Sequence, residues 1–148
     1  MKIRKNGKSD MTPNWQPISV LPKIAYIIDG MLDEAQGQYE NLLEAREKPH
    51  VLDDYTIDRV HNVYSTQLED VSIFDRQLTR WKKDQLDFDQ RQEVERLIKQ
   101  NEELRKVSKQ ILSLAAELKK GTINRILEKS DAELALDVLS GKLKLPKR

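Results

Sequence analysis

Residues 57–81 read IDRVHNVYSTQLEDVSIFDRQLTRW. A stripe of mostly apolar residues recurs in it at alternating steps of three and four: Ile57, Val60, Tyr64, Gln67, Val71, Phe74, Leu78 and Trp81. Steps of this kind keep side chains on one face of an α-helix. Residues 21–45 and 94–118 repeat the same spacing over the same length. Three equal helices with one apolar face each predict an all-α protein in which the three faces pack against one another.

The helix boundaries follow from capping signals. We expect helices over about residues 19–48, 54–83 and 89–120. Ser19 offers a hydroxyl to cap the first helix, and Pro22 falls in its first turn, where a missing amide costs little. Asp53 or Asp54 is the expected N-cap of the second helix. Gly121 is expected to end the third helix in a left-handed C-cap conformation.

Short connections make consecutive helices antiparallel neighbours. We therefore predict an up-down-up three-helix bundle over residues 17–121, preceded by a flexible basic N-terminal arm at residues 1–16. Residues 122–148 are predicted to form short C-terminal helices and a basic tail. Trp15, beside Pro17, either folds back over one end of the bundle or waits exposed for a partner.

The C-terminal appendix carries its own helix signals. Thr122 is an expected cap for one short helix, and Ser130 with Glu133 forms a capping box for a second. The second helix presents an apolar face of Leu134, Leu136, Val138 and Leu139. Helices this short are unstable in isolation. Their leucines must therefore dock on the bundle, on another subunit or on a partner protein.

Three polar residues interrupt the apolar faces: Gln38, Gln67 and Ser108. Antiparallel threading places Gln38 and Ser108 in the same layer of the bundle and Gln67 in the next, so the three are expected to meet. Buried and hydrogen-bonded to one another, they would select the register of the helices, as a buried asparagine does in a coiled coil. Exposure of the same residues to solvent is the alternative.

A second set of apolar residues lies at heptad spacing beside the main stripe: Ala25, Leu32 and Tyr39 in the first helix, and Val107 and Leu114 in the third. One interpretation is that these residues only widen the internal face, as a globular bundle requires. The other is self-association, because burying a second stripe in a dimer removes more apolar area from water.

Charge is distributed unevenly along the chain. Eight of the 26 basic residues lie in residues 1–8 and 142–148, which hold no acid. The 18 remaining basic residues face 25 acids, so residues 9–141 carry a formal charge of −7. Residues 21–48 hold six acids and three bases, and residues 90–120 hold five acids and eight bases. The first and third helices are therefore expected to attract each other.

The sequence offers little for catalysis or metal binding. Glu47 precedes His50 and Asp58 precedes His61 by three residues, but Pro49 breaks the first pair, and the second lies off the apolar face. The acids between Asp84 and Asp89 are better explained as a helix cap than as a calcium loop, which needs a glycine at its sixth position. Nucleotide-binding and hydrolase motifs are missing from the sequence. We expect no catalytic, metal-binding or cofactor-binding residues.

The function expected is a non-enzymatic protein–protein interaction or assembly module, an adaptor or structural subunit. It would bind through the C-terminal leucine face, the second apolar stripe or both, to a partner protein or to itself as a homodimer. The alternative is a nucleic-acid-associated protein that uses its basic N- and C-terminal arms on phosphates. No apolar run approaches the roughly 18 residues of a membrane span, so a cytoplasmic protein is expected.

Overall fold

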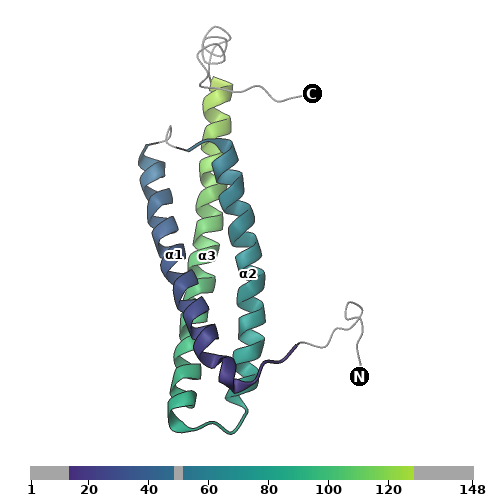
Figure 1. Ribbon diagram of the computed structural model, residues 1–148. Helices are drawn as coiled ribbons and strands as arrows, with labels where there is room; N and C mark the ends of the chain where they lie inside the picture. The colour runs from purple at the N-terminus through teal and green to yellow at the C-terminus, as the bar shows by residue number, and fades with distance from the viewer. Residues whose placement is uncertain (1–13, 49–51, 129–148) are drawn as a thin grey trace.

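The computed structural model of the chain describes residues 14–48 and 52–128, with the backbone alone for residues 122–128. A short 3-10 helix, η1 (Ile18–Val20), leads into α1 (Leu21–Glu47), α2 (Asp54–Lys82) and α3 (Phe88–Glu128). α1 and α3 run in one direction and α2 runs in the other (Figure 1). The described part of the chain contains no strand, which confirms the predicted all-α, antiparallel three-helix bundle.

The start of α2 matches its prediction, whereas the start of α1 differs. The Asp53 carboxylate accepts a hydrogen bond from the Thr56 amide at 2.8 Å, as an N-cap does. Before α1, Ser19 does not cap the helix and lies within η1. There the Val20 amide donates to the Pro17 carbonyl at 3.0 Å. This 3-10 turn satisfies an amide at the helix entry, so the Ser19 hydroxyl is not needed there.

The predicted end of the third helix at Gly121 is wrong, because α3 continues to Glu128. A glycine inside a helix costs only about 1 kcal/mol relative to alanine, and no proline follows to force a break. Thr122 therefore does not start a separate helix. The second predicted short helix, from Ser130, and the basic tail to Arg148 lie outside the described residues.

The core lies along α3, which packs against both α1 and α2. One cluster of buried side chains includes Leu42, Val71 and Leu104. The other, at the end where α1 begins and α2 ends, includes Ile28, Trp81 and Leu97. Most positions of the three predicted apolar faces are buried in these clusters. Within the described ranges, none of the helices combines the length and the apolar character that a membrane crossing requires.

Ion pairs link α3 to both of its neighbours. Arg96 reaches Asp29 on α1 at 2.8 Å, as the opposite charges of the two helices predict. The second α1–α3 pair, Arg46 with Glu117 at 3.7 Å, has the opposite polarity. All four side chains are about half exposed, and pairs of that kind contribute about 0–1 kcal/mol each. Apolar packing therefore determines the arrangement, and charge adds little to it.

Replacing Leu104 by alanine should lower the free energy of unfolding by about 2–5 kcal/mol, because the change leaves a cavity in a fully buried site of the core. Urea unfolding followed by circular dichroism measures the loss. Ile73→Ala, at a side chain that is 52% exposed, is the matched control and should change the free energy by less than about 0.5 kcal/mol. Equal losses in the two variants would contradict the assignment of the core.

Candidate functional site

The segment just before η1 docks on the last two turns of α2. The Gln16 amide donates to Gln77 Oε1 at 2.8 Å, and Trp81 Nε1 donates to the Gln16 carbonyl at 3.0 Å. Gln77 and Trp81 lie on one face of α2, four residues apart, and both are buried. These two side chains therefore hold the backbone of the entering chain in a fixed position.

This docking places Trp15 against α2. The guanidinium carbon of Arg80 lies 5.1 Å from the centroid of the indole ring, within the range of a cation–π contact. Trp15 is half-buried. Of the two alternatives for this residue, the structure shows the first: the tryptophan folds back over one end of the bundle.

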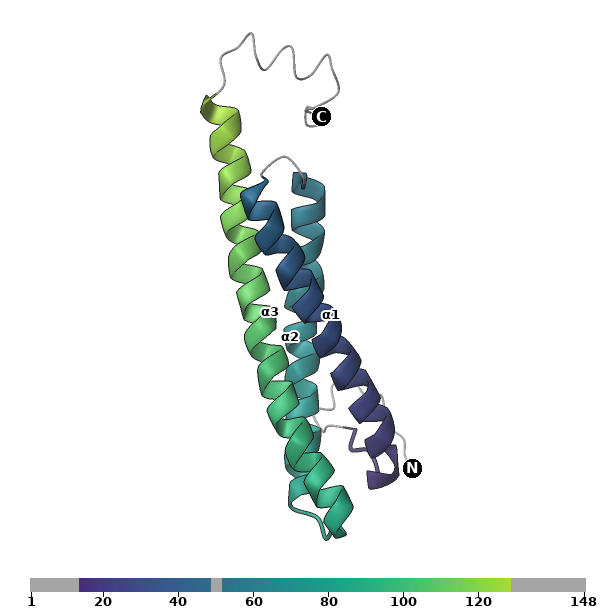
Figure 2. The ribbon, with the colours of Figure 1, turned by 90° about the vertical axis from the view of Figure 1, so that its left-hand side faces the viewer.

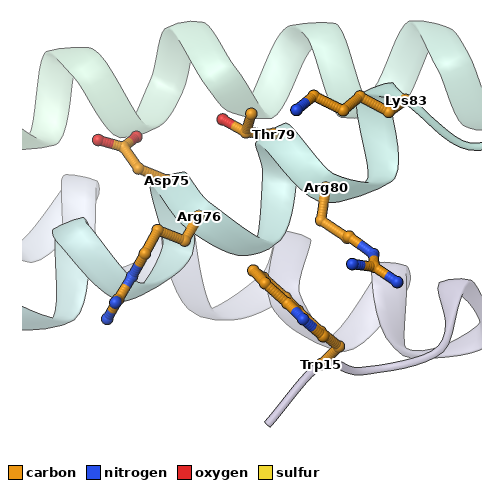
Figure 3. A pocket seen from close by; sticks show the side chains of 6 residues that line it. All are labelled: Trp15, Asp75, Arg76, Thr79, Arg80 and Lys83. Atoms are coloured by element: carbon orange, nitrogen blue, oxygen red, sulfur yellow. The ribbon is translucent and has the colours of Figure 1, made fainter. Parts of the chain in front are cut away.

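A surface cavity of about 340 Å³ opens beside the docked ring. Its walls are the Trp15 side chain, four residues of α2 (Asp75, Arg76, Thr79 and Arg80) and Lys83, the C-cap of that helix (Figure 3). In that view the indole ring lies between the side chains of Arg76 and Arg80. The cavity therefore combines one aromatic wall with three basic side chains.

The one carboxylate of the cavity, that of Asp75, already has partners on α3. It forms an ion pair with Arg105 and accepts a hydrogen bond from Asn101 Nδ2 at 2.7 Å. Arg76, Arg80 and Lys83 form no ion pair within the part of the chain that the structure describes. The positive charge of the cavity is therefore not compensated from within these ranges.

Asn101 is a buried polar residue to which the sequence pattern assigned no role. Its side chain is fully buried, and Nδ2 also donates to the Val71 carbonyl at 3.0 Å. Asn101 Oδ1 is buried without a hydrogen-bond partner among the described residues. The detectable signal was its position, since a single asparagine within an apolar stripe is typical of a residue that fixes helix register.

Two of the three predicted polar residues meet. Gln67 Nε2 donates to Ser108 Oγ at 3.2 Å, and Ser108 is fully buried. Gln38 is only half-buried and takes no part in this hydrogen bond. The contact therefore joins α2 to α3 and leaves α1 out.

The residues of the second apolar stripe face the core of the bundle. Ala25 and Leu32 belong to the buried clusters, as do Val107 and Leu114, and Tyr39 packs against the same core while half-buried. The structure thus supports the interpretation that these residues widen the internal face, and it gives Ala25 and Leu32 no free surface for a partner. The other predicted binding residues, Leu134, Leu136, Val138 and Leu139, lie outside the described residues.

Two of the side chains considered for metal binding, those of Asp58 and Asp87, have other partners. Asp58 forms an ion pair with Lys119 at 2.6 Å, and this hydrogen bond raises the pKa of Lys119. Asp87 caps α3, because its carboxylate accepts from the Gln90 amide at 2.8 Å and Gln90 Oε1 accepts from the Asp87 amide at 3.1 Å. His61 is exposed, and His50 lies outside the described ranges. Within those ranges, acidic, histidine and cysteine side chains form no group of three or more suited to a metal ion.

A second surface hollow, of about 440 Å³, is lined by side chains of α3 alone, among them Lys99, Lys106 and Lys109. Two carboxylates, Glu102 and Glu103, line it as well, and Glu102 pairs with Arg105. Because a single helix supplies every wall, this hollow lies between long side chains on an open surface.

The pair between Arg96 and Asp29 should make a small, pH-dependent contribution to stability. The hydrogen bond from Arg96 is the main reason that the pKa of Asp29 lies below its usual value of 3.8. A lowered pKa stabilises the fold above the unfolded-state value, and this contribution disappears as the pH falls through the lower folded-state value. Asp29→Asn should therefore cost less than about 1 kcal/mol at neutral pH, since both side chains are half exposed, and nothing in strong acid.

Urea unfolding between neutral pH and pH values below 3.8 measures this difference. Asp33→Asn on the same helix is the matched control, because Asp33 forms no ion pair among the described residues and should show no such pH-dependent loss. An Asp29→Asn variant that follows the Asp33→Asn curve at every pH would show that the pair does not stabilise the fold.

The whole chain was also compared with known proteins. It matches no protein-family model, no curated protein and no solved structure. Its function is therefore inferred from its own residues and contacts.

Proposed function

We propose that the chain is a non-enzymatic assembly module that binds through the end of α3 and the C-terminal segment, and that its first partner is a second copy of itself. The observation that carries the proposal is the unequal length of the helices. α1 spans 27 residues and α2 spans 29, whereas α3 spans 41.

The extra length of α3 lies at one end of the bundle. α1 ends at Glu47 and α2 begins at Asp54 at this end, while α3 continues past both (Figures 1 and 2). Among the α3 side chains that the structure describes, Leu118 is the last that packs against the core. The ten residues from Lys119 to Glu128, which we call the overhang, extend about 15 Å further. Within the described ranges, neither α1 nor α2 lies beside its last turns (Figures 1 and 2).

The sequence of the overhang contains the apolar residues expected of a helix that packs against a partner. It carries Ile123, Ile126 and Leu127 at steps of three and one, and the leucine-rich residues 134–139 follow. In proteins, most of the stability of a helix comes from packing of an apolar face rather than from helix propensity. Residues of this kind in a helix beyond the reach of α1 and α2 favour burial against another molecule.

Charge favours a second copy as that molecule. The sequence of the overhang carries Lys120 and Arg125, in addition to Lys119, which already pairs with Asp58 of the same chain. The end of α1 carries Glu40, Glu44 and Glu47, which are exposed and form no ion pair among the described residues. In the dimer that we propose, the overhang of one copy lies beside α1 of the other, and two-fold symmetry makes this contact occur twice. Basic overhang and acidic α1 are complementary in this arrangement.

The test is the mass of the full chain by sedimentation equilibrium. We expect a dimer, and Ile126→Gln with Leu127→Gln should weaken dimerisation by at least about tenfold, because each aliphatic side chain buried contributes about 1.5–3 kcal/mol. Ile73→Gln, at a half-exposed aliphatic residue elsewhere, is the matched control and should leave the dimer unchanged. Leu136→Gln with Leu139→Gln tests the segment beyond the overhang in the same way.

Charge reversal then tests the arrangement. Glu44→Lys with Glu47→Lys should weaken the dimer, and adding Lys120→Glu with Arg125→Glu in the same chain should restore it. A chain that stays monomeric at all concentrations would refute self-association. If neither the apolar nor the charge substitutions change the strength of dimerisation, the interface lies elsewhere on the molecule.

A further inference from the structure

The cavity beside Trp15 has the chemistry of a ligand site, and it lies at the end of the bundle opposite the overhang (Figure 1). We propose that it binds one nucleotide unit of a single-stranded nucleic acid, with a base against the Trp15–Arg80 wall and phosphates on Arg76 and Lys83. This site is separate from the assembly surface proposed above, so either proposal stands without the other.

The positive charge of the cavity favours an anionic ligand. Three basic side chains line it without an ion pair among the described residues, and its single carboxylate, Asp75, is bound by Arg105 and Asn101 on α3. The C-terminal dipole of α2 favours cations in the last turn, which accounts for Arg80 and the nearby Lys83. Arg76 lies a full turn earlier, beyond the reach of that effect. The helix dipole therefore does not account for Arg76, whose side chain is exposed and lines the cavity.

The aromatic wall of the cavity, formed by Trp15, favours an anionic ligand that carries a flat ring. Trp15 stays half exposed although its neighbour Gln16 is tied to two buried side chains by hydrogen bonds of 2.8 and 3.0 Å. The backbone beside the ring is therefore held in place before any ligand arrives, and Arg80 contacts the ring itself, which lowers the entropic cost of binding. Proteins that bind single strands combine such a ring with arginine and lysine side chains, and each stacked base contributes about 1–3 kcal/mol.

The surrounding chain favours a strand over a free nucleotide. The cavity is open to solvent, and its 340 Å³ lies near the lower limit of about 300 Å³ for small-molecule sites. Residues 1–13 precede Asn14 and Trp15 in the sequence, and they hold four basic residues, Lys2, Arg4, Lys5 and Lys8, against one acid, Asp10. A strand offers this basic sequence more phosphates than a free nucleotide does.

Fluorescence anisotropy of a labelled oligodeoxythymidylate, titrated with the full-length protein at low salt, is the primary measurement. Arg76→Gln with Lys83→Gln removes two phosphate contacts but leaves Arg80 on the ring. We expect affinity to fall at least about tenfold, and the slope of log affinity against log salt to shrink by about 1.4, because each single-strand phosphate contact contributes about 0.7. Trp15→Leu should weaken binding at least about fivefold through the lost stacking.

The matched control is Lys99→Gln with Lys106→Gln, which removes the same charge from the exposed basic surface of α3. It should change the affinity less than about twofold, since general attraction falls off within a Debye length. The intrinsic fluorescence gives a second readout. Trp81 is 1% exposed, so quenching by the strand should come from Trp15 and disappear in the Trp15→Leu variant.

Competition with unlabelled ligands identifies the chemistry. A single strand should displace the probe, whereas polyglutamate, inorganic phosphate and duplex DNA should compete far more weakly. A mononucleotide that competes as well as the strand would overturn the role of the strand. Polyglutamate as an equal competitor would reduce the site to a general anion surface, and equal losses in the control variant would do the same. Absence of binding at low salt would overturn the proposal outright.

Discussion

The structure depends on the burial of a single face of α3 against both α1 and α2. Leu97, Leu104 and Ile111 of that face are fully buried, and both core clusters draw on it. Since α1 and α2 each pack chiefly on α3, separating α3 exposes both clusters at once. The three helices are therefore expected to unfold as one cooperative unit rather than one by one.

Trp81 joins this core to the cavity at the end of the bundle. Its ring is buried in the second cluster, while its indole N–H holds the Gln16 carbonyl. The same side chain thus packs among apolar neighbours and fixes the segment that carries Trp15. A change in the core near Trp81 would shift the aromatic wall of the cavity as well, so the site is a product of the fold and not of a free loop.

The sequence predicted the features that depend on the periodicity of apolar residues. It failed at two helix ends, where local hydrogen bonding and small differences in helix propensity determine the structure. Steps of three and four located all three helices, and antiparallel threading brought Gln67 to Ser108. The Asp53 cap followed from residue type alone. The predicted helix end at Gly121 was wrong, because a glycine permits a helix end without requiring one. The predicted cap at Ser19 was wrong, because a 3-10 turn provides the hydrogen bond instead.

The cavity at Trp15 lay beyond such reasoning for a physical reason. Its walls come from residues sixty or more positions apart, brought together by hydrogen bonds between the backbone of Gln16 and the side chains of Gln77 and Trp81. Backbone contacts of this kind leave no pattern in the side chains of the docked segment. The Asn101–Asp75–Arg105 contacts were nearer to being predicted, since Asn101 stands at a position of the apolar stripe.

The length of α3 has a consequence for how the molecule could act. At 41 residues this helix is about 60 Å long, and it extends from the end that carries Trp15 to the opposite tip. A straight helix supported along most of its length by two others bends little. The protein would act as a stiff spacer, keeping whatever is held at one tip at a constant separation from whatever is held at the other.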